Sequence, residues 1–303
     1  MNTPQSPLVQ IFILSRNRVK YLKESLESCL ALKYDNFKVI VSENSTDHVT
    51  REFLQNHEQR DKFDVVLRNN LSYPVHTNRI LSEVTAPYFM MFHDDDVLLP
   101  SCLHTYIEVM SADDTLSAVG GNSLIIENEN RTNRDFMRRK TDCKVSTVRA
   151  FFENYFVRVS SHPAYPTYLF RASKVAQNRL ASRKGGGHSD SAFMFENLKN
   201  GPMYFSTKTI ALYRVHQSNM SGKINMRHIT ALVRYLKSQA PEETTLLLNY
   251  KYIHWVKHYF RGEHGQLKPR DRIIIFNVLK FFLRHPYFVV SKVLSKIRSK
   301  SLN

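Results

Sequence analysis

The chain has 303 residues, of which 42% are hydrophobic, and this suffices for a sizeable core in one or two domains. It carries 43 Lys and Arg against 27 Asp and Glu, and the net charge of +16 favours polyanionic partners such as nucleic acid, anionic lipid or phosphorylated small molecules. The 3 cysteines show no CxxC spacing, so no disulfide framework or zinc site is implied and a reducing compartment fits. The first residues lack a signal-peptide pattern and no apolar stretch reaches about 18 residues, so we expect no transmembrane helix.

Strand-like and helix-like patterns alternate through the first hundred residues. Short apolar runs of the strand type are separated by stretches with apolar residues at helical spacing. We expect strands at 9–14, 37–41, 63–67 and 88–92, and helices at 21–32, from about 48, and at 77–84. This alternation predicts a right-handed, largely parallel βαβ sheet flanked by helices, in which the polar residues at the strand ends share one crevice.

The fourth of these strands, at 88–92, is a continuous apolar run, as in strands buried on both faces. It ends in His93 and in three consecutive carboxylates, Asp94, Asp95 and Asp96. Adjacent carboxylates repel one another unless a cation lies among them, and Mg²⁺ takes one or two carboxylates together with substrate phosphates. The stretch therefore predicts a site for a metal diphosphate. The alternative is a solvated acidic turn that caps the next helix.

The chain continues with the same alternation as far as residue 213. We expect helices at 101–110, 151–159 and 193–198, and strands at 118–126, 167–171 and within 201–213. Residues 127–146 are polar and basic without periodicity, so they are expected to form a surface loop or a mobile lid. His162, which precedes one of these strands, is a candidate for contact with substrate, although histidines in loops are more often inert.

Three segments of the first hundred residues resemble family-two glycosyltransferases with the GT-A fold, and their order and spacing agree. Residues 15–18 (SRNR) resemble the Ser/Thr-x-Asn-Arg loop that follows the first strand in that family. Residues 41–47 (VSENSTD) are similar to its acid-rich V-D-D-G-S-T-D turn, and residues 93–96 (HDDD) resemble its DXD element at the end of a hydrophobic strand. The resemblance implies an α/β fold of the GT-A type and a nucleotide diphosphosugar as donor.

The resemblance also implies site residues. Those expected to bind the donor are Ser15, Arg16, Asn17, Arg18, Glu43, Arg68, Asp94 and Arg214. Glu43 would accept a hydrogen bond from the base or ribose where the family usually has Asp, and its alternative role is an acid at a helix start. Arg68 would approach the base or diphosphate, unless it is a surface arginine. Asp95 and Asp96 would hold a divalent metal, Mn²⁺ or Mg²⁺, and the HDDD spelling leaves two registers of D-x-D open.

A glycine-rich segment in the second half of the chain leads to a candidate catalytic base. Residues 185–187 are three consecutive glycines in a chain with 9 in all, which predicts a flexible loop. Asp190 follows at the start of an expected helix. In the resembling family an acid at this point is the catalytic base, often in a Glu-Asp pair, and here the pair is Ser189 and Asp190. A helix N-cap is the alternative role of Asp190.

A further segment, residues 213–221 (YRVHQSNMS), matches the family pattern Y-R-x-H-x-x-x-x-S. The resemblance implies that this segment is a loop that closes over the donor diphosphate. Arg214 would then neutralise phosphate charge, and His216 would complete the metal or pyrophosphate shell. An ordinary basic loop is the alternative interpretation.

The resemblance and the composition together predict two regions. The first, 1–224, would be the GT-A catalytic domain, with a nucleotide-sugar-binding half at about 6–120 and an acceptor half at 121–224. The second, 225–303, would be a basic amphipathic helical extension with helices at 227–237, 242–259 and 270–300. Its last helix, divided by Pro286, is suited to lying on an anionic membrane surface, although packing on the core would use the same pattern.

These expectations combine into a metal-dependent inverting glycosyltransferase. Its donor is expected to be a UDP-sugar, and its acceptor a glycan hydroxyl, on a lipid-linked glycan, in the synthesis of cell-surface polysaccharide such as O-antigen or capsule. The expected location is cytoplasmic, at the inner face of the cell membrane. One alternative is a sugar-phosphate nucleotidyltransferase, although a Gly-rich phosphate loop with a Lys is missing near the first strand. The other is a basic nucleic-acid-binding protein, but no nucleic acid is expected because the strand ends carry acids.

Overall fold

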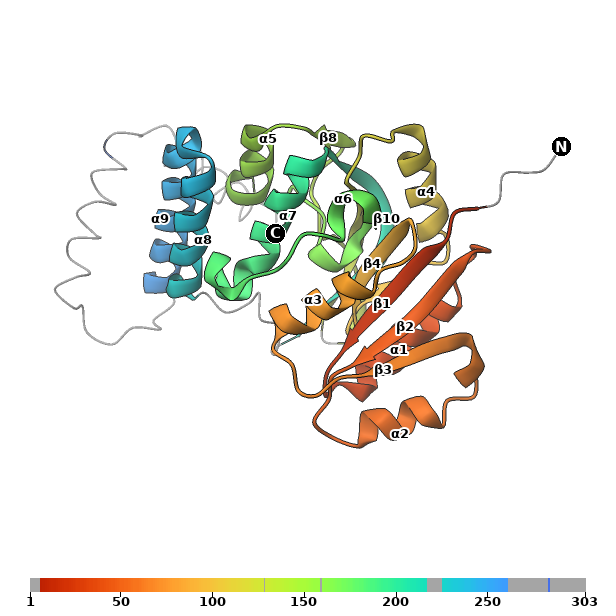
Figure 1. The fold of residues 1–303 in the computed structure, drawn as a ribbon. Coiled ribbons are helices and arrows are strands. Elements are labelled where there is room, and N and C mark those ends of the chain that lie inside the picture. The colour runs from red at the N-terminus through yellow and green to blue at the C-terminus, as the bar shows by residue number, and fades with distance from the viewer. Residues whose placement is uncertain (1–5, 128, 159, 217–224, 261–282, 284–303) are drawn as a thin grey trace. The chain divides into compact units, whose positions relative to one another are not determined.

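In the computed structural model, residues 6–127, 129–158, 160–216 and 225–260 and Leu283 are described, and Figure 1 traces their path. The chain divides into two compact units, Met1–Tyr250 and Lys251–Asn303. The helix expected at 270–300 lies outside the described residues. Among those that are described, no helix combines the length and apolar character needed to cross a bilayer.

The expected alternation of strands and helices is present. The strands are β1 (Val9–Ser15), β2 (Phe37–Glu43), β3 (Phe63–Leu67), β4 (Tyr88–His93), β5 (Val97–Leu98), β6 (Ala118–Glu127), β7 (Asn130–Asp135), β8 (Cys143–Val145), β9 (Tyr168–Arg171) and β10 (Met203–Val215). The helices are α1 (Val19–Leu30), α2 (Val49–Gln55), α3 (Tyr73–Glu83), α4 (Cys102–Ala112), α5 (Val148–Phe152), α6 (Ala172–Val175), α7 (Ser189–Asn200), α8 (Met226–Gln239) and α9 (Thr244–Phe260).

One mixed sheet runs through the first unit in the order β3-β2-β1-β4-β9-β6-β10-β5. Strands β1 to β4 pair in parallel, and β6 pairs in parallel with β10. Between these two parallel groups, β9 pairs antiparallel with both β4 and β6, so β4 and β6 point in the same direction. The carboxyl ends of β1, β2, β4 and β10 therefore lie along one edge of the sheet, where ligands bind in open α/β folds.

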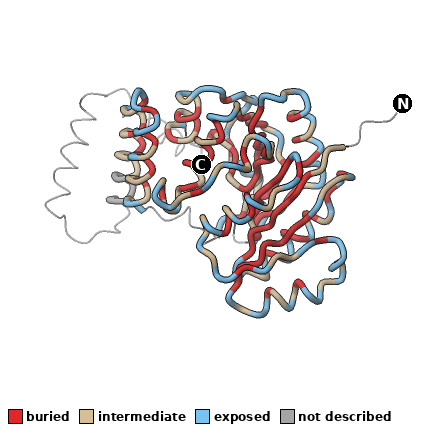
Figure 2. The backbone as a smooth tube through the Cα atoms, viewed as in Figure 1, coloured by how far each residue is buried: buried red, intermediate tan, exposed pale blue. Residues whose placement is uncertain are grey.

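The sheet is covered on both faces, which explains why its strands read as continuous apolar runs. In β4, Phe89 and Met91 belong to the core cluster that includes residues of α3, α5, α7 and α8. The alternate residues Met90 and Phe92 belong to the cluster on the other face, with residues of α1 and α4. Figure 2 shows the central strands as almost uninterrupted buried chain. His93 follows this alternation and so faces the side of α3 and α7.

The expectation of a loop or mobile lid at 127–146 is wrong. β7 pairs antiparallel with β6 to form a hairpin, and β8 pairs antiparallel with β10. The β7 sequence NRTNRD is polar and mostly exposed, so the ladder forms from backbone groups without the hydrophobic alternation that identifies a strand. A second difference is that α3 begins at Tyr73 rather than near 77, with Pro74 in the first turn, where its missing N–H is harmless.

The helices expected at 227–237 and 242–259 are present as α8 and α9. Apolar residues of α8, among them Ile229, Leu232 and Leu236, are buried in the core cluster that also holds α7. α8 therefore belongs to the first unit, which extends to Tyr250, past the predicted start of a helical extension at 225. Membrane contact by the extension stays a prediction.

Helix α8 also packs against the glycine-rich turn that precedes α7, and this contact explains one of the glycines. Gly186 has a φ of +56°, and a Cβ atom there would lie 2.3 Å from Cδ2 of His228 on α8. The backbone N–H of Gly187 donates to Nδ1 of His228 at 3.1 Å. Instead of a flexible loop, the segment is a pair of short 3₁₀ turns that the α8 side chain holds in place.

We expect Gly186→Ala to lower the free energy of unfolding through this contact. The left-handed backbone adds about 1–2 kcal/mol for a residue with Cβ, and overpacking against the His228 ring adds about 1–3 kcal/mol. Urea unfolding of Gly186→Ala, His228→Ala and the double variant measures both terms. In the His228→Ala background, Gly186→Ala should keep only the backbone term. An equal loss in both backgrounds would show that the ring is not the obstacle.

Candidate active site

The loops after β1 and β2 are joined at the edge where the strands end. Ser15 and Glu43 are partners in the register of β1 and β2, and the Ser15 hydroxyl donates to Oε2 of Glu43 at 2.9 Å. The Ser45 N–H donates to Oε1 of the same carboxylate at 2.5 Å, and the Asn17 N–H donates to the Ser45 hydroxyl at 2.7 Å. Glu43 is fully buried, so in this structure both its oxygens stabilise the turn beneath the crevice.

Asp94 ties the first loop to the end of β4. Its Oδ2 accepts from the Arg16 N–H at 2.9 Å, and its Oδ1 forms an ion pair with the Arg18 guanidinium. The same guanidinium reaches Oδ2 of Asp95 at 2.5 Å, so Arg18 bridges two of the three acids. Burial raises the pKa of Asp94 to about 7, although Arg18 and the Arg16 N–H act in the opposite direction. Asp94 thus has both oxygens occupied by the loop that follows β1.

The end of β10 closes over the other two acids. The Arg214 N–H donates to Oδ1 of Asp96 at 2.9 Å, and its Nε donates to the backbone oxygen of Asp95 at 2.9 Å. His216 places Nε2 at 2.9 Å from Oδ2 of Asp95. The described start of the segment that resembles a diphosphate-binding loop, residues 213–216, therefore contacts the acidic turn directly, although more than a hundred residues separate the two along the chain.

Two acids that the sequence pattern did not indicate surround Arg214. Its guanidinium pairs with Glu24 of α1 and, at 3.0 Å, with Glu129 in the β6–β7 turn, and it lies 4.8 Å from the centre of the Tyr21 ring. Only 3% of the Arg214 side chain is exposed, so its charge is met by carboxylates inside the protein. Arg214 in this structure holds the wall of the crevice together.

Three side chains at the end of β4 could hold a metal ion. Ligand atoms of His93, Asp95 and Asp96 all lie within 4.8 Å of one another. Nε2 of His93 and Oδ2 of Asp96 are buried, and neither has a hydrogen-bond partner in the part of the chain that the structure describes. An unsatisfied buried polar atom is unfavourable by about 1–3 kcal/mol, and a cation between these two atoms would relieve both. His93 was not among the predicted ligands, although its place at the end of the strand alternation indicates it.

The charges of the acidic turn are consistent with a cation site. Burial and the neighbouring Asp95 raise the pKa of Asp96 well above its ordinary value. Burial also opposes charge on Asp95, but His93, Arg18 and His216 outweigh it and lower the pKa of Asp95. Carboxylate oxygens are the ligands that hard divalent ions prefer, so the residues present fit Mn²⁺ or Mg²⁺.

Arg68 lies at the margin of this network. Its guanidinium forms two hydrogen bonds to the Glu83 carboxylate of α3, at 2.8 and 2.5 Å, and its Nε donates to the Ser42 hydroxyl at 2.9 Å. The side chain is 8% exposed. In this structure Arg68 joins β2 to α3 rather than entering the crevice.

Asp190 lies in the first turn of α7, on the same side of the sheet as His93. Helix α7 begins at Ser189, four residues earlier than expected, so Asp190 is part of the helix. Burial raises the pKa of Asp190, while the nearby His188 lowers it. Burial is the largest cause of the raised pKa values of Tyr73 and Tyr165, and the negative charge of Asp190 raises them further.

The same two tyrosines connect Asp190 to the acidic turn. The ring centre of His93 lies 6.4 Å from that of Tyr73 and 6.2 Å from that of Tyr165. Tyr73 and Tyr165 are thus neighbours both of the possible metal ligand His93 and, through the electrostatic effect on their pKa values, of Asp190. His162 stacks on Tyr155 with ring centres 4.0 Å apart, and burial lowers its pKa to about 4, so it is a neutral packing residue near pH 7.

The first half of the sequence is similar to a known protein family and to known proteins. Residues 10–174 match the family described as "Glycosyl transferase family 2". An uncharacterized glycosyltransferase of Haemophilus influenzae is 26% identical over 126 residues, which are 41% of this chain and 39% of that protein. An uncharacterized glycosyltransferase of Methanocaldococcus jannaschii is 29% identical over 108 residues, 34% of this chain and 37% of that protein. The chain thus matches about two fifths of the length of these curated relatives.

Solved structures resemble a larger part of the chain. S. aureus TarS 1-349 has a TM-score of 0.63 with 14% identity and covers 89% of this chain and 78% of its own, and its complex with UDP-GlcNAc has a TM-score of 0.62 with 91% and 80% covered. Mannosyltransferase PcManGT from Pyrobaculum calidifontis, in complex with GDP-Man and Mn²⁺, has a TM-score of 0.57 with 13% identity and covers 99% of this chain and 87% of its own. Likeness at these identities shows the fold, and the expected GT-A type of α/β fold is confirmed.

Proposed function

Since this chain belongs to glycosyl transferase family 2, we propose that it moves a sugar from a nucleotide diphosphosugar to a hydroxyl group of a glycan acceptor. That the enzyme is a glycosyltransferase follows from the family. The observation that carries the finer proposal is the crevice at the strand ends, where His93, Asp95 and Asp96 converge with two buried ligand atoms unsatisfied. Structural neighbours were solved with UDP-GlcNAc and with GDP-Man and Mn²⁺, which supports a nucleotide-sugar donor.

We propose that the donor, a UDP-sugar, lies along the loops after β1 and β2. Ser15 and Glu43 shape the floor of the nucleoside pocket through their mutual hydrogen bond, and Arg16 holds the rim through Asn70 and the Leu71 carbonyl. Arg18 is the partly exposed cation of the crevice, with 30% of its side chain accessible, and so it is suited to meeting the donor diphosphate. The remaining predicted donor residues act by holding these loops: Asn17, Arg68, Asp94 and Arg214.

We propose that Asp95, Asp96 and His216 hold the metal together with His93, which has a ligand atom within 4.8 Å of those of the two acids. Bound there, Mn²⁺ or Mg²⁺ would supply a Lewis acid that stabilises the negative charge of the departing nucleoside diphosphate. Asp94 is left outside the set because the loop after β1 occupies both its oxygens. This choice distinguishes between the two D-x-D registers.

We propose Asp190 as the general base. Its carboxylate takes the proton from the acceptor hydroxyl while that oxygen forms a bond to the anomeric carbon and the bond from this carbon to the diphosphate oxygen breaks. A single displacement of this kind inverts the anomeric configuration. The raised pKa of Asp190 supports the assignment, because a base with a pKa closer to the working pH accepts a proton more readily.

We propose the acceptor and the location from the composition of the chain after residue 225. The basic composition after residue 225 favours a lipid-linked acceptor in cell-surface polysaccharide synthesis, such as O-antigen or capsule, with the chain at the cytoplasmic face of the membrane. Residues 1–224 would form the catalytic domain, and in the extension at 225–303, whose first helix α8 is packed in the core of the first unit, the membrane-facing part would follow Tyr250. Because the family is established, the nucleotidyltransferase and nucleic-acid-binding alternatives are set aside.

Hydrolysis of a panel of UDP-, GDP- and dTDP-sugars, with Mn²⁺ or Mg²⁺ and with EDTA, tests the proposal. We expect slow hydrolysis of one donor that EDTA removes. If no donor is hydrolysed, and calorimetry detects no nucleoside diphosphate binding with metal present, the proposed function is wrong.

The pH dependence of turnover tests Asp190 further. A general base works only when ionised, so turnover should fall as the pH drops through the pKa of Asp190, at a higher pH than for an ordinary aspartate. His188 lowers this pKa, and therefore His188→Gln should move the acid limb of the kcat profile to higher pH. His104→Gln, at an exposed position on α4, is the matched control and should leave the limb in place. If the acid limb of His188→Gln stays at the wild-type pH, the limb does not report the ionisation of Asp190.

A further inference from the structure

A second polar site lies on the acceptor half of the chain, away from the acidic turn. It is a cavity of about 250 Å³, here called the basic cavity, between the segment after β7 and the segment after α5. Four cationic side chains line it together with serine hydroxyls: Arg138, Arg139, Lys140, Arg158, Ser160 and Ser161.

The positive charge of the basic cavity is only partly balanced by carboxylates of the described residues. Arg158 pairs with Glu153 at 3.2 Å, and Glu153 is shared with Arg149. Arg138 and Lys140 form no ion pair within the described part of the chain. Arg139 reaches only a neutral oxygen, that of Asn154 at 3.0 Å, and its buried Nε has no hydrogen-bond partner among the described residues.

Backbone hydrogen bonds and a buried serine fix the wall of the basic cavity. The Arg138 N–H donates to the Ser160 carbonyl at 2.7 Å, which joins the two segments. Ser160 has a φ of +52°, an uncommon conformation for a residue with Cβ. Ser161 is buried, and its hydroxyl donates to the Asn154 carbonyl at 2.8 Å. The guanidinium groups are therefore presented on a fixed backbone.

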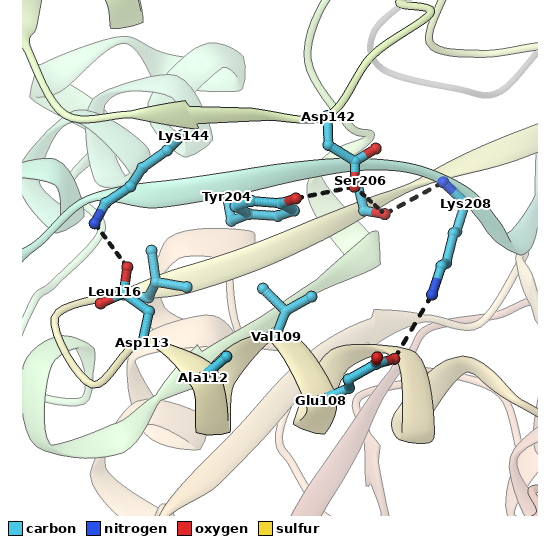
Figure 3. A pocket seen from close by; sticks show the side chains of 10 residues that line it. All are labelled: Glu108, Val109, Ala112, Asp113, Leu116, Asp142, Lys144, Tyr204, Ser206 and Lys208. Atoms are coloured by element: carbon cyan, nitrogen blue, oxygen red, sulfur yellow. Dashed lines mark hydrogen bonds and ion pairs between the residues drawn. The ribbon is translucent and has the colours of Figure 1, made fainter.

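A cavity at the amino ends of β6 and β10 gives a contrast. It measures about 350 Å³ and also has lysines at its rim. There, however, Lys144 pairs with Asp113 at 2.6 Å and Lys208 pairs with Glu108 at 3.6 Å, as Figure 3 shows. Both lysines of that cavity are thus paired with carboxylates of its own lining, whereas three of the four cations of the basic cavity have no carboxylate partner among the described residues.

The basic cavity is connected to the proposed base by two aromatic residues. His162 follows Ser161 directly and stacks flat on Tyr155, with an angle of 2° between the rings. Burial and, in addition, the charge of Asp190 raise the pKa of Tyr155, so this ring lies within the field of the proposed base. The residues that line the basic cavity all belong to the predicted acceptor half, and none of them belongs to the loops after β1 and β2.

We propose that the basic cavity binds a phosphate-type anionic group of the acceptor, so that the acceptor is a phosphorylated glycan or a phosphate-linked carrier. Planar guanidinium groups bind phosphate oxygens through paired hydrogen bonds, and the hydroxyls of Thr141 and Ser160, which also line the cavity, would add further donors. That the bound group belongs to the acceptor rests on the proposed function. The anion site itself is inferred from the cations that have no carboxylate partner among the described residues. Phosphate in the glycan and phosphate in a lipid carrier share this chemistry.

Inorganic phosphate is the probe that tests the cavity. We expect calorimetry in EDTA, at constant ionic strength, to detect phosphate binding to the wild type that weakens about tenfold or more in Arg138→Gln/Arg158→Gln, since two charge-assisted interactions are lost. Arg131→Gln/Arg134→Gln, on the exposed strand β7, removes the same charge outside the cavity and should bind phosphate like the wild type. Lys140→Gln, at an exposed position, is a milder second variant that should show a smaller loss.

Three further results decide the interpretation. Equal phosphate binding in the cavity and control variants would overturn the proposal. So would a rise of the donor KM with added phosphate, because the anion would then occupy the donor site. Vesicles of phosphatidylcholine with or without phosphatidic acid distinguish phosphate in a lipid from phosphate in a glycan. Loss of vesicle binding in the cavity variant with unchanged phosphate binding would indicate a membrane surface instead.

Donor hydrolysis should be equal in all variants, and its absence everywhere would contradict the proposed function without affecting the phosphate result.

Discussion

Asp96→Asn should lower metal-dependent donor hydrolysis by about a thousandfold, since a metal ion at the leaving group contributes several kcal/mol to the transition state. Asp96 has one oxygen on the Arg214 N–H, while the other is buried with no hydrogen-bond partner in the described chain. Asn offers one oxygen and no charge to a cation. Mn²⁺ titration followed by calorimetry, together with donor hydrolysis rates, measures the loss.

Two neighbouring acids sharpen this prediction. Asp95→Asn should show a comparable loss, because its carboxylate faces the same space as His93. Asp94→Asn should retain more of the Mn²⁺ affinity and lose activity through the loop that Arg16 and Arg18 hold. Asp113→Asn, near the cavity of Figure 3, is the control for removal of one acid and should not change Mn²⁺ binding. Loss of Mn²⁺ binding in Asp94→Asn with retention in Asp96→Asn would assign the other register.

Most of the sheet could be predicted from the sequence because its strands are buried on both faces. The residues of β1, β2 and β4 form uninterrupted apolar runs, and each run ends at polar residues that the parallel arrangement brings to one edge. The position of the acidic turn followed from the same pattern. Strands β7 and β8 could not be predicted in this way, because an exposed edge strand needs only backbone partners.

The partners of the charged site residues were harder to predict, for a physical reason. Arg214 meets Glu24 and Glu129 across the fold, and neither acid belongs to a local pattern that indicates its role. Arg18 and Arg68 were expected to face ligand, yet in this structure each pairs with acids of the protein. An arginine in a loop finds the nearest carboxylate in space, and sequence spacing does not reveal which one that is.

Asp190→Asn should lower the turnover of donor hydrolysis by about 10²–10⁴-fold, the range for loss of a general base. Water attacking the sugar in place of the acceptor also needs its proton removed, so hydrolysis reports on the base before the acceptor is known. The donor Kd, measured by calorimetry with Mn²⁺, should be unchanged because Asp190 is not one of the groups that could hold the metal and is not part of the loops after β1 and β2. Glu196→Gln removes an acid from the same helix and should leave turnover unchanged.

Thermal unfolding distinguishes a catalytic role of Asp190 from a structural one. Burial raises the folded-state pKa of Asp190 above its unfolded value, so the ionised carboxylate disfavours folding once the pH exceeds the unfolded pKa. Asp190→Asn should then keep or raise the Tm near pH 7, and the difference should shrink as the pH falls. An acid that served only the start of α7 would instead stabilise the helix by about 0.3–1 kcal/mol, and its removal would lower the Tm. A lower Tm with wild-type turnover would assign Asp190 to the helix start and leave the base to be sought among other groups facing the tyrosines.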